Sequence, residues 1–217
     1  MKSVIILSGG MDSTVALYKA INEGRDVTAL SFNYGSKHNE AEFEHAKRTC
    51  EKFGIRHERI SLGFIDDLFC SDLLKSGGNI PEGHYADPNM KKTVVPFRNG
   101  IMLAIAVGFA ESIGAESVII GNHYGDHAVY PDCREEFIEY MNRAARSGTY
   151  AGVRIDSPFC EISKTDIAKI GRKLNVNWAD TYSCYNGREK HCGKCGTCFE
   201  RKEAFRDAGV PDVTDYE

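Results

Sequence analysis

Short apolar runs alternate with longer amphipathic stretches along the first part of the chain. Residues 4–7 form a continuous apolar run, and residues 27–32 and 55–62 each contain a further strand pattern. Between them, residues 13–22 and 38–53 have helical character, and glycines follow both stretches. Strands buried on both faces that alternate with helices are typical of a parallel sheet. The pattern therefore predicts an α/β fold with a doubly wound, Rossmann-like parallel sheet.

This rhythm breaks between residues 63 and 96, where glycines and prolines are frequent and periodicity is weak. A long irregular segment inside a compact domain is often functional, so we expect an insertion or lid with some helix over residues 65–74. A mobile surface insertion is the alternative interpretation. Regular patterns then return, with helices expected over residues 99–113 and 132–145 and a strand over residues 117–121.

The last third of the chain predicts smaller elements. A short extended segment is expected at residues 154–157, and Ser163 and Asp166 form a capping pattern that opens a further helix. A short helix is expected over residues 199–208, after a cluster of cysteines.

Composition places the chain among ordinary soluble globular proteins. Its 217 residues are 42% hydrophobic and 27% charged, with a formal net charge of -4. The mild acidity argues against a protein held on nucleic acid by a broad basic face. The apolar run at residues 4–7 is too short for a signal peptide or membrane span, and residues 101–110 are interrupted by Gly108. We therefore expect a cytoplasmic protein without direct nucleic-acid or membrane partners.

A glycine-containing turn follows the first predicted strand and precedes the first predicted helix. Free backbone N–H groups at such a turn, helped by the helix dipole, can bind an oxyanion, and serine hydroxyls add donors. An acidic residue in this loop suits a bound Mg²⁺ or a loop cap. A glycine turn with a helix cap is the alternative interpretation. The residues expected to bind the phosphates are Leu7, Ser8, Gly9, Gly10, Met11, Asp12, Ser13 and Thr14.

Two common phosphate motifs do not match this loop, because the lysine of G-x-x-x-x-G-K-[ST] and the spacing of G-x-G-x-x-G are both missing. The string S-G-G-x-D-S at residues 8–13, after an N-terminal buried strand, resembles the PP-loop of the ATP pyrophosphatases. That resemblance implies binding of ATP and cleavage between its α- and β-phosphates.

Four of the eight cysteines fall close together near the C-terminus, with the spacing C-x7-C-x2-C-x2-C. They are Cys184, Cys192, Cys195 and Cys198. Zinc takes four such ligands in a tetrahedron, and glycines between the cysteines permit tight turns. We expect one structural Zn²⁺ per subunit in a closed site. Residues 1–180 are then the PP-loop nucleotide-binding domain, and residues 181–217 a zinc-binding lobe packed on it.

Other uses of these cysteines are open at this stage. A disulfide is disfavoured in the cytoplasm, and a redox C-x-x-C pair has no need for the flanking cysteines. An iron–sulfur cluster can use the same short spacing. His191 is a further possible ligand.

Several other strings are shared with one enzyme family. They are residues 32–35 with His38, residues 93–99, Gly121-Asn122, the string Y-P-D-C-R at residues 130–134 with Phe137, and Ser183-Cys184-Tyr185. With the cysteine spacing, the chain resembles the 7-cyano-7-deazaguanine synthases, which form a nitrile in the queuosine and archaeosine pathways. The resemblance runs from about residue 4 to residue 208.

The resemblance implies a reaction and its partners. The small-molecule substrates are 7-carboxy-7-deazaguanine and ammonia, and the cofactors are ATP and Mg²⁺. ATP adenylates the carboxylate, ammonia displaces AMP to give the amide, and a second ATP activates the amide oxygen so that loss of AMP leaves the nitrile. The family resemblance also suggests a homodimer.

The resemblance implies residue roles by position along the chain. Asp12, Arg98 and Lys164 are expected to be catalytic. Arg98 in a surface salt bridge and Lys164 as an exposed first-turn lysine are the structural alternatives. The residues expected to bind substrate are Tyr34, His38, Arg98, Asn99, Tyr130, Asp132 and Arg134. Helix capping is the alternative role for Asp132, and core packing the alternative for Phe137.

One segment departs from the family pattern. Residues 122–128 differ from the N-A-x-D-Y-S-G form common in the family, and Glu135 replaces a frequent proline. A ligase that joins the deazaguanine carboxylate to a protein or another amine therefore remains an alternative. A tRNA-thiolating enzyme is disfavoured by the net charge, and a nucleic-acid-binding zinc module by the intact phosphate loop.

Overall fold

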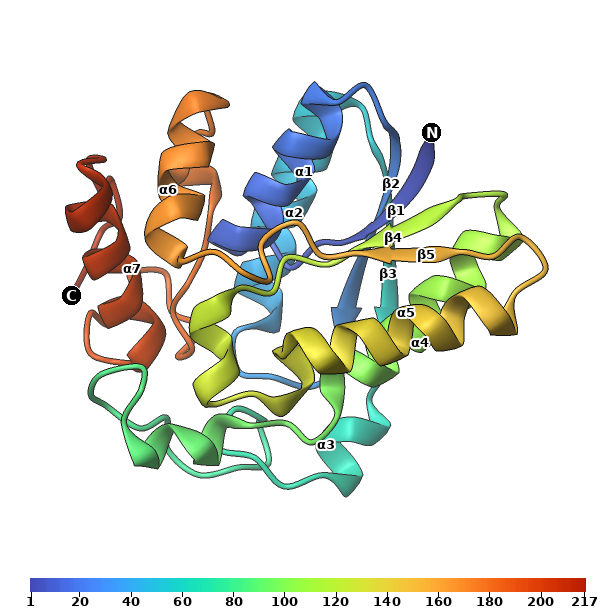
Figure 1. Cartoon of the computed structure of the whole chain (residues 1–217). Helices are drawn as coiled ribbons and strands as arrows, with labels where there is room; N and C mark the ends of the chain where they lie inside the picture. Colours follow the sequence, from blue (N-terminus) through green and yellow to red (C-terminus); the bar gives the residue numbers. More distant parts are fainter.

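The computed structural model describes all 217 residues, as a parallel sheet between two helical layers (Figure 1). The five strands are β1 Lys2–Ile6, β2 Asp26–Asn33, β3 Arg56–Ser61, β4 Ser117–Ile119 and β5 Arg154–Asp156. They lie in the order β3-β2-β1-β4-β5, and every neighbouring pair is parallel. Strand order reverses beside β1, so its carboxyl end lies at the switch point where such sheets bind ligands. The predicted fold class is confirmed.

Alternate residues of β1 enter two separate cores, as expected of a strand buried on both faces. Val4 packs in the core with α4 (Arg98–Ser112) and α5 (Glu135–Gly148). Ile5 packs in the core on the other face, and both side chains are fully buried. That second layer contains α1 Met11–Asn22, α2 Asn39–Phe53, α6 Lys164–Lys173 and α7 Gly196–Ala208 (Figure 1).

Two helices begin three residues away from their predicted starts. The helix expected from residue 132 begins at Glu135, because residues 131–133 form a 3-10 turn. Asp132 Oδ2 accepts the backbone N–H of Asn99 at 2.8 Å, so it caps the start of α4 and not the start of its own helix. The helix expected from residue 199 begins at Gly196 and includes Cys198.

The segment over residues 63–96 is more ordered than a loose insertion. It contains only one short α-helix, α3 (Phe64–Leu68), in place of the helix expected over residues 65–74, and a 3-10 helix at Pro88–Thr93. Leu73, Leu74, Tyr85 and Met90 are buried, and Glu82 pairs through its backbone with Cys195. This packing argues against the mobile alternative.

The division at residue 180 stays a prediction. None of the helices is both long and apolar enough to cross a membrane.

Candidate functional site

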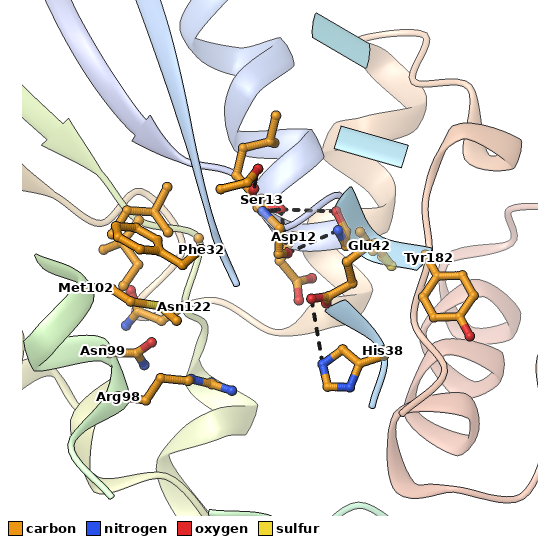
Figure 2. A pocket seen from close by; sticks show the side chains of 18 of the residues that line it. Asp12, Ser13, Phe32, His38, Glu42, Arg98, Asn99, Met102, Asn122 and Tyr182 are labelled. Carbon is orange, nitrogen blue, oxygen red and sulfur yellow. Dashed lines mark hydrogen bonds and ion pairs between the residues drawn. The ribbon is translucent and has the colours of Figure 1, made fainter. Parts of the chain in front are cut away.

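A cavity lies at the carboxyl ends of the central strands, where most of the predicted site residues meet (Figure 2). Those that line it are Leu7, Ser8, Gly10, Met11, Asp12, Ser13, Tyr34, His38, Arg98, Asn99, Tyr130 and Lys164. Four predicted site residues are absent from its lining: Gly9, Thr14, Asp132 and Arg134.

The loop between β1 and α1 is built for close approach of an anion. Gly9 has φ of +85°, and a Cβ there would lie 2.2 Å from the carbonyl oxygen of Glu42, so only glycine fits. Ser8 Oγ accepts the Gly10 N–H at 3.1 Å and lies 3.0 Å from Ser13 Oγ. No side chain caps α1, so its first-turn N–H groups remain available for a phosphate.

Lys164 lies against the acidic residue of this loop. Its Nζ is 3.1 Å from Asp12 Oδ2 and 2.7 Å from Glu200 Oε2, and its side chain is 11% exposed. Burial opposes the ammonium form, but Asp12 and Glu200 outweigh it and raise the pKa of Lys164. Lys164 is therefore a buried cation beside the phosphate loop, and not the exposed lysine of the alternative interpretation.

His123, Asp126 and Glu200 complete this charged group, and none of them was among the predicted site residues. His123 Nε2 lies 3.5 Å from Asp126 Oδ1 and 3.6 Å from Glu200 Oε1. Glu200 is on α7, directly after the cysteine cluster. The only signal in the sequence was the departure from the family pattern at residues 122–128, which includes two of the three.

Arg98 extends from the opposite wall of the cavity (Figure 2). Its Nη1 donates to Tyr34 OH at 3.1 Å, and its guanidinium lies over the Tyr34 ring. No carboxylate lies within ion-pair distance of it, which excludes the surface salt-bridge alternative. A half-buried guanidinium without a carboxylate partner suits a carboxylate or phosphate ligand. Tyr130 OH is held nearby, between Thr93 and Tyr185 hydroxyls at 2.9 Å each.

Glu42 and His38 form the wall next to the phosphate loop (Figure 2), with His38 Nε2 3.6 Å from Glu42 Oε2. Burial lowers the pKa of His38 to about 3 and raises the pKa of Glu42 to about 8. Both groups are then uncharged at neutral pH. A protonated Glu42 does not repel phosphates, which explains how a carboxyl group is tolerated at this position.

We expect Glu42→Gln to stabilise the fold at alkaline pH. The native state keeps a proton on Glu42 between pH 4.5 and 8 that the unfolded chain releases, so stability falls as pH rises through this window. The variant should exceed the wild type by about 4 kcal/mol at pH 8.5 and match it at pH 4.5. Urea unfolding at both pH values measures this, with Glu40→Gln on the exposed face of α2 as the control. Equal gains at both pH values would refute the assignment.

Three further residues of the matched strings make contacts that suit a structural role. Arg134 is exposed, and its Nε donates to the carbonyl oxygen of His127, which places it outside the cavity. Phe137 packs edge-on against Phe97, in agreement with the core-packing alternative. Asn99 Nδ2 lies 3.1 Å from Cys133 Sγ, and burial raises the pKa of that thiol, which favours the less nucleophilic thiol form over the thiolate.

The four clustered cysteines are all buried, and their sulfur atoms lie within 4.8 Å of one another. Such a group fits a tetrahedral ion with metal–sulfur bonds of about 2.3 Å. Backbone N–H groups of Cys192 and Cys195 point at neighbouring sulfurs, which suits thiolates. His191 Nε2 accepts the Ser183 N–H at 3.0 Å and lies outside the group, so it is not a ligand.

Known proteins share both the sequence and the fold of this chain. The family model described as queuosine biosynthesis protein QueC matches residues 2–209. A 7-cyano-7-deazaguanine synthase of Porphyromonas gingivalis is 56% identical over 99% of this chain and 97% of its own length. One from Desulfotalea psychrophila is 53% identical over 99% and 98%.

A solved structure shares the fold at much lower identity. NMN synthetase from Francisella tularensis aligns over 96% of this chain and 77% of its own, with a TM-score of 0.51 and 17% identity. This likeness concerns the fold alone. The family model and the two synthases span almost the whole chain, which confirms the resemblance identified from its motifs. The chain belongs to the QueC family of queuosine biosynthesis proteins.

Proposed function

We propose that the protein converts 7-carboxy-7-deazaguanine and ammonia to 7-cyano-7-deazaguanine at the expense of ATP. The carboxylate attacks the α-phosphate of ATP and releases diphosphate. Ammonia then displaces AMP to give the amide. A second ATP adenylates the amide oxygen, and loss of AMP and a proton leaves the nitrile. The observation that carries the proposal is the identity of 56% to a 7-cyano-7-deazaguanine synthase across the whole chain. Nothing in the comparisons supports transfer to a protein amine.

The arrangement of charges supports this chemistry, because two anions must meet for the adenylate to form. The phosphate loop offers backbone N–H groups and Ser8 and Ser13 hydroxyls to the phosphates. Lys164 adds a cation on the same side, and Arg98 adds another on the opposite wall, where it can bind the substrate carboxylate. Tyr34 and Tyr130 offer aromatic faces for a flat base.

Magnesium and zinc have separate places in this proposal. Asp12 Oδ1 is buried without a hydrogen-bond partner, so it remains available as an oxygen ligand for Mg²⁺. When bound, Mg²⁺ neutralises phosphate charge. The four cysteines fill the coordination shell of Zn²⁺, one ion per chain, in a structural role. A homodimer in the cytoplasm completes the proposal, and light scattering after gel filtration tests the dimer.

The reaction itself can be tested with purified protein, ATP, Mg²⁺, 7-carboxy-7-deazaguanine and ammonium. We expect the nitrile by mass spectrometry, with the amide appearing first and AMP released at both stages. Omission of ammonium should stop the nitrile and leave the adenylate. Accumulation of the amide alone, or turnover only with a protein acceptor, would overturn the proposal.

A further inference from the structure

A buried charged group lies beside the phosphate loop and contains more negative than positive charge. The carboxylates of Asp12, Asp126 and Glu200 face a single ammonium, that of Lys164. The imidazole of His123 is at the centre and is fully buried. These five side chains come from α1, α6, α7 and the 3-10 helix at Tyr124–Ala128 with its N-cap, so no single element holds them together.

The proton of His123 is fixed by the backbone. The Gly125 N–H donates to His123 Nδ1 at 3.0 Å, so Nδ1 is an acceptor and the ring proton is on Nε2. The backbone N–H of His123 donates to Asp126 Oδ2 at 3.1 Å, and the two hydrogen bonds together form a capping box. Nδ1 of the imidazole therefore takes part in helix capping, whereas the N–H at Nε2 remains available as a separate donor.

The Nε2–H points into the carboxylates. The nitrogen Nε2 lies 3.5 Å from Asp126 Oδ1, 3.6 Å from Glu200 Oε1 and 3.9 Å from Asp12 Oδ2, and it makes no hydrogen bond. A buried donor without a partner is costly unless its surroundings are electrostatically favourable. Three carboxylates that share one donor supply such surroundings, and the donor in turn opposes their mutual repulsion.

We propose that His123 is a positioning residue for adenylation. Its Nε2–H holds the carboxylates of Asp12 and Glu200 in the orientation that presents the Lys164 ammonium to the phosphate loop. The inference rests on the proposed function and deepens it. Without this donor, the carboxylates separate, and Lys164, bonded to both Asp12 and Glu200, loses its place beside the phosphates.

Asp126 depends less on this donor, because Tyr85 OH already donates to its Oδ1 at 2.7 Å. The readout that separates positioning from a structural role is rescue of turnover by a variant that restores the donor.

Two substitutions separate the donor from the cap. His123→Asn keeps an acceptor near the position of Nδ1 and places no N–H at the position of Nε2. His123→Gln places an amide N–H near the position of Nε2 and lacks the cap. We expect His123→Asn to lower kcat for ATP-dependent AMP release at least tenfold and the protein to remain folded. His123→Gln should recover most of kcat.

His84→Asn is a matched control, because His84 has the same contacts in an exposed setting. Its Nδ1 accepts the Ala86 N–H at 3.2 Å, and its Nε2 lies 3.1 Å from Glu203. Wild-type kcat in His123→Asn, or equal losses in the Asn and Gln variants, would overturn the inference. If His123→Asn fails to fold, kcat of His123→Gln decides: a near-wild-type value supports the inference, and a tenfold loss overturns it.

The test remains distinct from that of the proposed function. If the wild type releases no AMP, the proposed function fails, and calorimetric titration with ATP and Mg²⁺ decides the role of His123. Binding at least tenfold weaker in His123→Asn than in His123→Gln supports it, and equal binding overturns it.

Discussion

Replacement of Cys195 by serine should release the bound metal, lower the melting temperature by at least about 10 °C and abolish ATP-dependent AMP release. Four buried sulfurs within 4.8 Å form a closed site, and a serine hydroxyl is a poor zinc ligand at neutral pH. Structural zinc binding contributes about 10–16 kcal/mol in small zinc domains, so even partial coupling to folding gives a large shift.

Activity should be lost with the metal because segments that hold the phosphate loop and Lys164 are connected directly to the cysteine site. Cys195 is the N-cap of α7, the helix that carries Glu200. On the other side, Tyr182, two residues before Cys184, donates its backbone N–H to the Gly9 carbonyl oxygen at 2.9 Å. Release of the metal therefore frees the phosphate loop and the partner of Lys164 together.

Metal content by atomic emission, melting by circular dichroism and AMP release measure the three effects. Cys70→Ser is the control, since Cys70 is exposed and outside the cluster. One zinc per chain in the wild type and in this control is expected. A Cys195→Ser protein with wild-type melting and turnover would show that the cluster has no structural role.

The parts of the site that were predictable from the sequence are those encoded locally. Residues 8–13 are consecutive, and a turn between a strand and a helix has few conformations, so their pattern alone indicated a phosphate loop. Short cysteine spacings likewise bring sulfurs together without help from the rest of the fold. Strand and helix alternation was enough for the parallel sheet, because burial on both faces leaves a continuous apolar signal in β1.

The parts that could not be predicted depend on contacts between distant segments. Glu200 is a single acidic residue in polar surroundings, and nothing in its neighbourhood distinguishes it from an exposed carboxylate. Its role follows only from the packing of α7 against α6, which brings Glu200 to Lys164. Asp132 shows the same limit, since its capping role was foreseen but the helix that it caps begins more than thirty residues earlier.

Replacement of Lys164 by methionine should lower kcat/KM for adenylation by about 10²–10³-fold. Methionine keeps most of the length of the side chain and removes the cation nearest to the phosphate loop. The same change leaves Asp12, Asp126 and Glu200 without their ammonium, and loss of one partner from a buried charge network costs about 3–5 kcal/mol. We therefore expect losses of both activity and stability at neutral pH.

The loss of stability and the loss of activity should depend differently on pH. Burial already raises the pKa of Glu200, and removal of Lys164 raises it further, so this carboxyl group takes up a proton more readily as the pH falls, and the repulsion then decreases. The stability deficit of Lys164→Met should thus be smaller at pH 5 than at pH 8, whereas turnover should not recover. Denaturant unfolding and AMP release at both pH values measure this. Lys169→Met, on the exposed face of α6, should match the wild type. An equal deficit at both pH values, or turnover restored by acid, would contradict the assignment of Lys164 as the cation that the carboxylates hold for the phosphates.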